Sequence, residues 1–246
     1  MKKKTIVLVC AAIGIGLGSC EAIQNLRRGR VFPVDETTAR QEFLRSLARQ
    51  GLRVPPERIE AIPTRGTWLG NLWVFGVRNP KWELVGGPVY NGMFLVGPMV
   101  AGRQDAVTQS RYVTCDFVDA FQRQINPNPP TTAENALKIA KSFAWLSMRS
   151  HPDRLQVLQR GEVPADLLVW LRRTRPELVQ TIAEQIVGPS VSVNQVAPKG
   201  ETVFTVELCT QSKDFWGDIY FWHMEIGRHV FSVSQRPIYK APRGLA

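Results

Sequence analysis

The sequence predicts an α+β protein in which antiparallel sheets carry helices packed on one face. A helical pattern at the start of the folded part is followed by short runs rich in Val, Trp, Phe and Tyr, from Arg58 to about Phe117. The same order of helices and then strands recurs after a Pro-rich segment at 125–132. The chain has 246 residues, of which 44% are hydrophobic and 21% charged, so it can bury a core.

The first predicted helix begins near Thr38, which forms a capping box with Gln41, and ends at Gly51. The strand-like runs that follow are punctuated by glycines, as expected for tight turns and bulges. We therefore expect a meander of antiparallel strands after this helix. The apolar residues that share one face of the helix are Ala39, Phe43, Leu44 and Leu47.

The second half opens with a predicted helix that Thr131 and Glu134 cap and that runs to about Met148. Its core face is rich in Ala. Two further helices are predicted at 164–173 and 175–187, with Thr174 capping the latter and Gly188 at its exit. Strands are expected at 190–197, 202–210, 216–226 and 229–239.

The last two strands form the clearest hairpin, with a turn at Gly227-Arg228 and Ile226 paired with His229. Strand alternation then places one apolar set toward the core and one polar set on the opposite face. The apolar set is Trp222, Met224, Ile226, Phe231 and Val233. The polar set is His223, Glu225, Ser232 and Ser234.

This pattern divides the folded part into a first α+β unit at 35–124, a Pro-rich linker at 125–132 and a second α+β unit at 133–240, before a flexible tail at 241–246. By analogy of architecture alone, each unit is similar to a cystatin-like or NTF2-like fold. An offset of 94 residues repeats the Thr-Thr-Ala sequence and maps Cys115 onto Cys209, but it also places Trp68 opposite Glu162. Whether the two units are a duplication stays open at this point.

The first twenty residues have the features of an export signal. Three lysines at 2–4 precede an apolar run at 5–16, which is shorter than the roughly 18 residues that a membrane span needs. The sequence Leu17-Gly18-Ser19-Cys20 follows directly. This segment resembles the lipobox of bacterial lipoproteins, whereas the rest of the chain resembles no family. The alternative is an ordinary secretory signal that is cleaved elsewhere.

The lipoprotein resemblance implies a signal peptide at 1–19, cleavage before Cys20, a diacylglycerol on the Cys20 thiol, and palmitate as a further acyl chain of the lipid anchor. Residues 20–34 would then form a tether that holds the protein at the membrane of the cell envelope. Glu21 stands where an Asp is the inner-membrane retention mark in Gram-negative lipoproteins, which favours the outer membrane, facing the periplasm. Without its signal the chain keeps an excess of basic residues, yet an exported protein is not expected to bind nucleic acid.

Two cysteines remain in an oxidising compartment once Cys10 has left with the signal and Cys20 carries lipid. Cys115 and Cys209 therefore form the candidate disulfide. Such a bridge would close a loop of nearly a hundred residues and contribute on the order of 4 kcal/mol. The alternative is two buried, unpaired thiols.

Residues that are typical of chemistry are few. His151-Pro152-Asp153 resembles the HPD loop of J-domain co-chaperones over about a dozen residues, but the aromatic-Leu-Gly segment before it is missing, so we interpret it as a helix stop and a turn. His223 and Glu225 share a strand face that His229 does not, so no metal site is expected. The remaining candidates for a ligand-facing surface are Trp68, Trp73 and Trp82, for which core packing is the alternative.

We therefore expect a membrane-anchored envelope lipoprotein whose folded part is a non-catalytic binding or scaffolding module with an envelope protein as partner. No nucleophile, acid and base converge in the sequence, and no cofactor is expected. The alternative is an envelope hydrolase or a small-ligand carrier, which a deep pocket holding His223 with Glu225 would favour.

Overall fold

The structure is a computed structural model, and the description below covers the residues that it places. These are residues 35–49, 53–69, 73–78, 90–96, 99–100, 103–104, 107–109, 118, 121–122, 124–148, 152–196, 200–212 and 218–241. The predictions for the signal peptide at 1–19, the tether at 20–34, Cys20, Trp82, Cys115 and His151 lie outside the described residues.

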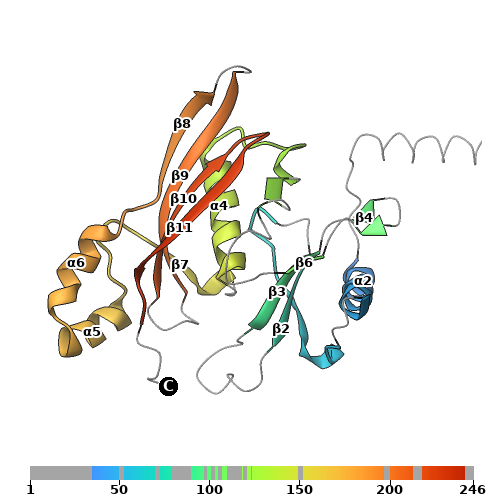
Figure 1. The fold of residues 1–246 in the computed structure, drawn as a ribbon, viewed down its shortest axis with the longest axis horizontal. Coiled ribbons are helices and arrows are strands. Elements are labelled where there is room, and N and C mark those ends of the chain that lie inside the picture. The colour runs from blue at the N-terminus through green and yellow to red at the C-terminus, as the bar shows by residue number, and fades with distance from the viewer. Residues whose placement is uncertain are drawn as a thin grey trace, which may run out of the picture.

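The first half of the described chain forms a helix and a four-stranded antiparallel sheet (Figure 1). The strands lie in the order β1-β2-β3-β6, which confirms the predicted meander. Two short strands pair as a separate ribbon. The elements are α2 (Glu36–Arg49), η1 (Pro56–Arg58), β1 (Ile59–Ile62), β2 (Trp73–Arg78), β3 (Tyr90–Val96), β4 (Met99–Val100), β5 (Arg103–Gln104) and β6 (Val107–Gln109).

The second half forms three helices and a five-stranded antiparallel sheet. Its strands lie in the order β11-β10-β9-β7, and β8 pairs with β9 on the same edge as β7, further along the strand. The α+β class is therefore confirmed. The elements are α4 (Ala133–Ser147), η3 (Pro152–Arg154), β7 (Leu155–Leu158), α5 (Ala165–Thr174), α6 (Glu177–Gln185), β8 (Ser190–Val196), β9 (Glu201–Ser212), β10 (Ile219–Ile226) and β11 (Phe231–Tyr239).

The helix starts differ from the predicted caps. Helix α2 begins at Glu36, so Thr38 lies inside its first turn. Helix α4 is capped by Thr132, whose hydroxyl accepts a hydrogen bond from the backbone of Asn135 at 3.2 Å, and not by Thr131. Thr174 is the last residue of α5, and its hydroxyl donates to the carbonyl of Trp170. Neighbouring threonines offer the same capping chemistry, so sequence alone does not decide between them.

The main core lies between α4 and one face of the five-stranded sheet. Alternate residues of β9 and β10 point toward α4, which contributes small alanines beside the larger Phe143 and so allows helix and sheet to approach closely. Trp222 is fully buried at the centre of this core. The other buried sheet residues of the cluster are Phe204, Val206, Leu208, Met224, Ile226 and Phe231.

The same core contains residues from the first half of the chain. Ile62, Leu69 and Val74 pack in one cluster with α4 and the five-stranded sheet. Ile125 and Pro130, near the two ends of the predicted linker at 125–132, are also buried. The core is therefore continuous across the predicted boundary between the two units.

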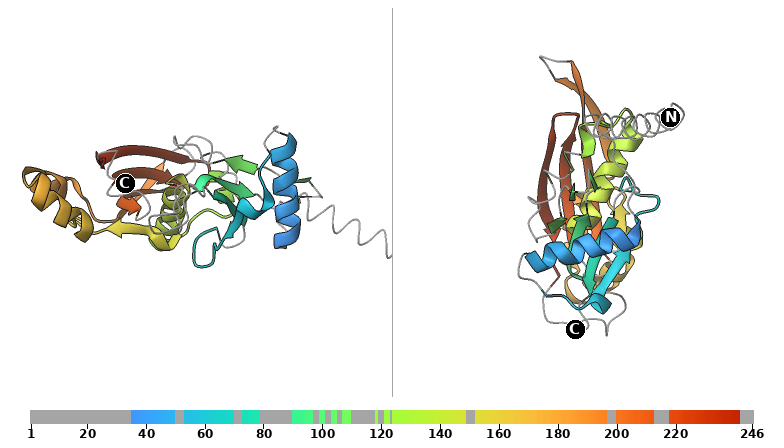
Figure 2. Two further views of the ribbon diagram at one scale, coloured as in Figure 1. Left: turned by 90° about the horizontal axis from the view of Figure 1, so that it is seen from below. Right: turned by 90° about the vertical axis from the view of Figure 1, so that its right-hand side faces the viewer.

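Two smaller clusters lie at opposite ends of the molecule (Figure 2). At one end α2 packs on β1 and β2, where the rings of Phe43 and Phe75 are stacked with centroids 5.1 Å apart. At the other end α5 and α6 cover part of the sheet face that points away from α4, around Cys209 and Ile219. Helix α2 covers one of these apolar clusters, and α5 and α6 together cover the other.

The hairpin of β10 and β11 has the predicted faces but a different register. Ile226 pairs with Phe231, not with His229, because the turn spans four residues rather than two. A shift of two residues preserves strand alternation, so the predicted apolar set still faces the core. His229 lies in the turn, and its backbone nitrogen donates to the Glu201 carboxylate at 2.7 Å.

The two halves share an order of elements that the offset of 94 residues does not align. In each half a long helix leads through a short 3-10 helix into an edge strand, and Pro56-Glu57-Arg58 recurs as Pro152-Asp153-Arg154, which is 96 residues later. A glycine with positive φ follows each edge strand, at 83° for Gly66 and 73° for Gly161. If α5, α6 and β8 are taken as an insertion, the strands β7, β9, β10 and β11 follow one another across their sheet as β1, β2, β3 and β6 do across theirs. This shared strand order favours an internal duplication.

Candidate functional site

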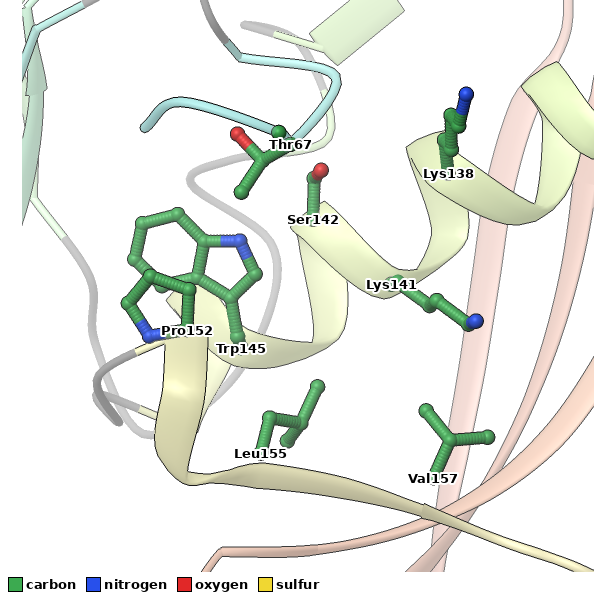
Figure 3. Close-up of a pocket in the computed structure, with 9 residues that line it drawn as sticks. Thr67, Lys138, Lys141, Ser142, Trp145, Pro152, Leu155 and Val157 are labelled. Carbon is green, nitrogen blue, oxygen red and sulfur yellow. The ribbon is translucent and has the colours of Figure 1, made fainter. Parts of the chain in front are cut away.

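A pocket of about 350 Å³ lies between α4, the edge strand β7 and the turn at Gly66 (Figure 3). This volume is at the lower end of the range of about 300–1,000 Å³ that is typical of ligand pockets. Its walls come from the first half of the chain and from the second, because the turn reaches across to α4. The residues that line it are Gly66, Thr67, Lys138, Lys141, Ser142, Trp145, Pro152, Leu155 and Val157.

The turn at Gly66, which lines the pocket, is fixed by its own hydrogen bonds. Gly66 adopts a left-handed conformation that residues with a Cβ rarely adopt. The Thr67 hydroxyl donates to the carbonyl of Thr64 at 2.6 Å and accepts from the backbone of Leu69 at 3.1 Å. Leu69 is fully buried, and it anchors the turn in the main core.

Helix α4 supplies the polar groups of the inner wall. Ser142 is buried, and its hydroxyl accepts a hydrogen bond from the backbone nitrogen of Trp68 at 3.1 Å, which ties the turn to the helix. One turn further along, Trp145 is 2% exposed, and its indole nitrogen has no hydrogen-bond partner among the described residues. In Figure 3 this nitrogen lies on the edge of the ring nearest Ser142. A buried donor without a partner costs free energy, so this site is unusual.

The pocket is electropositive. Lys138 and Lys141 line it, and its described lining residues include no carboxylate. Lys138 forms an ion pair with Glu134 at 2.8 Å, and the hydrogen bond and charge of this lysine lower the pKa of the Glu134 carboxyl. Lys141 has no ion-pair partner within the described part of the chain. The two side chains extend from α4 in different directions, with Lys141 on the side of Val157.

The predicted residues His223 and Glu225 lie elsewhere, on the sheet face that points away from α4. His223 Nδ1 is 3.2 Å from a carboxylate oxygen of Glu207, its direct neighbour on β9. Glu225 accepts a hydrogen bond from Ser232 at 3.1 Å across the pair with β11. These are cross-strand surface contacts of the kind that sheets commonly carry. The pocket therefore does not contain His223 or Glu225.

The two predicted tryptophans that are described do not share a surface. Trp68 packs beside the main core, 5.3 Å from the ring of Phe121. Trp73 opens β2 and packs on the cluster beneath α2, 6.3 Å from Phe75. Each is partly buried, so both contribute to packing in two different clusters.

Cys209 is fully buried on β9 as a free thiol, in the cluster beneath α5 and α6. Burial raises the pKa of its thiol, and a hydrogen bond with the backbone of Val187 opposes that effect. Because Cys115 lies outside the described residues, the disulfide stays a prediction.

We expect Cys209 in the reduced, folded protein to react with iodoacetamide at pH 8 at least about tenfold more slowly than in the unfolded chain, because the reagent needs an exposed thiolate. Mass spectrometry of a Cys115→Ser variant, with and without denaturant, measures this rate for Cys209 alone. The raised pKa also means that the stability of the reduced protein falls as the pH rises above about 8.5, where the unfolded thiol ionises. Rapid alkylation of the folded variant would contradict the described burial.

Among the described residues, no group of three or more His, Cys, Asp or Glu side chains lies close enough to hold a metal ion. No helix within the described ranges has the length and apolar composition needed to cross a membrane.

The pocket residues were not identified from the sequence because their pattern is that of an ordinary amphipathic helix. Lys138 and Lys141 are typical of a solvated face, and Trp145 is typical of a core face. The one sequence signal was Ser142, a polar residue among the apolar positions of the helix. The contribution of the turn at Gly66 depends on tertiary structure, which local patterns do not report.

In comparisons with known proteins, no family model, no curated protein and no solved structure matched the chain.

Proposed function

We propose that the protein is a lipid-anchored component of the bacterial envelope whose folded part is a non-catalytic binding module. The observation that carries the binding role is the pocket between α4, β7 and the Gly66 turn. It combines a preformed apolar wall with a few fixed polar groups, as binding pockets do. Its described lining residues include lysines and hydroxyls but no His, Cys, Asp or Glu, so none of them matches a nucleophile with an adjacent imidazole or carboxylate base.

The anchoring part of the proposal is supported by the sequence Leu17-Gly18-Ser19-Cys20 and the short signal before it. Two or three acyl chains on Cys20 would hold the folded part at a membrane surface. Helix α2 begins at Glu36, so the residues between the anchor and the fold would act as a tether. Under this proposal the pocket is available to an envelope component that is in reach of the tether.

We expect the Cys20→Ala variant to lose lipid and to shift from the membrane fraction to the soluble fraction or to remain as an unprocessed precursor, because no thiol is left to acylate. Cys10→Ala is the matched control, since it removes a thiol from within the signal. Intact mass, alkyne-palmitate labelling and cell fractionation measure the outcome in a Gram-negative host. A Cys20→Ala protein that is still processed and still held at the membrane would overturn the anchor.

The binding role has its own test. A photo-reactive residue in place of Thr67, which lines the pocket, should crosslink one specific envelope component in cells. The same residue in place of Val169, exposed on α5 and away from the pocket, is the control. Equal crosslinking patterns from the two positions would contradict a binding role for this pocket.

A further inference from the structure

We propose that the ligand of this pocket is a small amphipathic anion, with a carboxylate or phosphate head on a compact apolar body. This inference rests on the proposed binding function, and it names the chemical class of the ligand. It comes from three features of the pocket: its charge, its apolar floor and its unpartnered donor.

The charge of the pocket selects an anion. Lys141 extends along the gap between α4 and β7 and has no carboxylate partner among the described residues. A carboxylate or phosphate beside its ammonium group would accept a charge-assisted hydrogen bond, which is stronger than a hydrogen bond between neutral groups. Lys138 adds positive potential at the same helix face, although its ion pair with Glu134 offsets part of it. A cationic ligand would meet both lysines without a counter-charge.

The floor of the pocket selects an apolar body. Leu155 and Val157 of β7 point toward α4, and both are only partly buried. Pro152 and the ring of Trp145 continue this apolar surface. Covering it would remove apolar area from water, at about 25 cal/mol per Å². An inorganic ion would leave this area exposed, so the ligand must be more than an ion.

The indole nitrogen of Trp145 is a buried donor in a residue that lines the pocket. It lies in a 2% exposed side chain and lacks a partner among the described residues, so an acceptor that reached it would satisfy a buried group. Its position one helical turn from Lys141 places an ammonium and an N–H donor on one helix. Figure 3 shows the two side chains pointing in different directions, so Lys141 would meet the charged head of the ligand and the indole nitrogen would be a second, separate polar position.

The test uses the full chain in phosphatidylcholine nanodiscs and four water-soluble probes. Phenyl phosphate and benzoate carry the proposed chemistry, phenyltrimethylammonium reverses the charge, and inorganic phosphate lacks the apolar body. Isothermal titration gives the affinities. The ¹⁵N-indole signal of Trp145, assigned with Trp145→Phe, reports on the site itself, and empty nanodiscs correct for partition into lipid.

We expect phenyl phosphate and benzoate to bind and to move the Trp145 signal. Lys141→Gln should weaken both about tenfold or more, the factor expected for a lost charge-assisted hydrogen bond. Lys240→Gln is the matched control, because Lys240 is exposed after β11, at the opposite edge of the sheet from β7, and it should change the affinity less than twofold. Lys138→Gln should have a smaller effect than Lys141→Gln, since Lys138 already has a partner.

Three results would overturn the inference. Binding of phenyltrimethylammonium as tight as that of phenyl phosphate would show that charge is irrelevant and would exclude an anion site. Inorganic phosphate that binds as tightly as phenyl phosphate excludes the apolar body. An unchanged affinity in Lys141→Gln excludes the proposed contact. If the anions fail but crosslinking from position 67 still finds one component, the binding function stands and only the ligand class is wrong.

Discussion

Replacement of Trp222 by Ala is expected to lower the free energy of unfolding by about 4 kcal/mol, in the range that large aromatic deletions cost. The side chain is fully buried, and its ring lies edge-on to Phe143 of α4 with centroids 6.3 Å apart. Its indole nitrogen donates to the buried hydroxyl of Thr210 at 2.8 Å. Alanine would leave a cavity between helix and sheet and would remove this hydrogen bond.

Trp222→Phe is the matched variant that separates the two effects. It keeps an aromatic ring against Phe143 and loses the donor to Thr210, whose hydroxyl retains its bond to the sulfur of Met148 at 3.1 Å. We expect a loss of about 1–2 kcal/mol from this variant, the usual cost of one buried hydrogen bond with some loss of packing. Urea unfolding followed by circular dichroism measures both. A loss below about 1 kcal/mol for Trp222→Ala would contradict the central position of this side chain.

Strand alternation explains why the sequence located this core correctly. Trp222, Met224 and Ile226 recur at every second position, and Phe231 continues the set after the turn. The predicted register was wrong by two residues, yet the faces were right, because only an odd shift exchanges them. The sequence therefore predicts which side chains are buried in a hairpin more securely than which residues pair.

Local signals were less decisive where several residues offer the same chemistry. Thr131 and Thr132 both precede α4, and only the backbone conformation selects Thr132 as the cap. The repeat of Pro-Glu-Arg and Pro-Asp-Arg before the two edge strands was present in the sequence, but the offset chosen from the Thr-Thr-Ala sequence concealed it. A three-residue match carries little information, whereas matched elements and strand order together carry more.

The pocket could not be predicted from the sequence because its parts are distant along the chain. Thr67 and Trp145 are separated by most of the first sheet, and a hydrogen bond between Trp68 and Ser142 brings their segments together. The residues that sequence patterns favoured, His223 and Glu225, form cross-strand contacts on the opposite face of the sheet. Histidine is rare in this chain, so a search of the sequence for functional residues favours His223. A pocket, however, requires a concave surface, which only the fold supplies.

Phe121→Ala is expected to lower the free energy of unfolding by about 3–5 kcal/mol and to do so in a single transition. The Phe121 ring is fully buried and joins segments from both predicted units. Its centroid lies 5.3 Å from that of Trp68, 5.1 Å from Phe143 and 5.5 Å from Phe231. Removal of this ring weakens contacts on both sides of the predicted linker, so neither half should keep its stability.

Phe43→Ala provides the comparison that decides between one cooperative unit and two. Phe43 belongs to the cluster beneath α2, away from Phe121, and it stacks on Phe75 of β2. Because β2 also places Val74 in the main core, loss of the α2 cluster should propagate to the second half. We therefore expect calorimetry to show one transition that Phe43→Ala and Phe121→Ala both shift. Two transitions, of which Phe43→Ala shifts only one, would instead support independently folding units at 35–124 and 133–240. The shared core would then only hold the two folded units together.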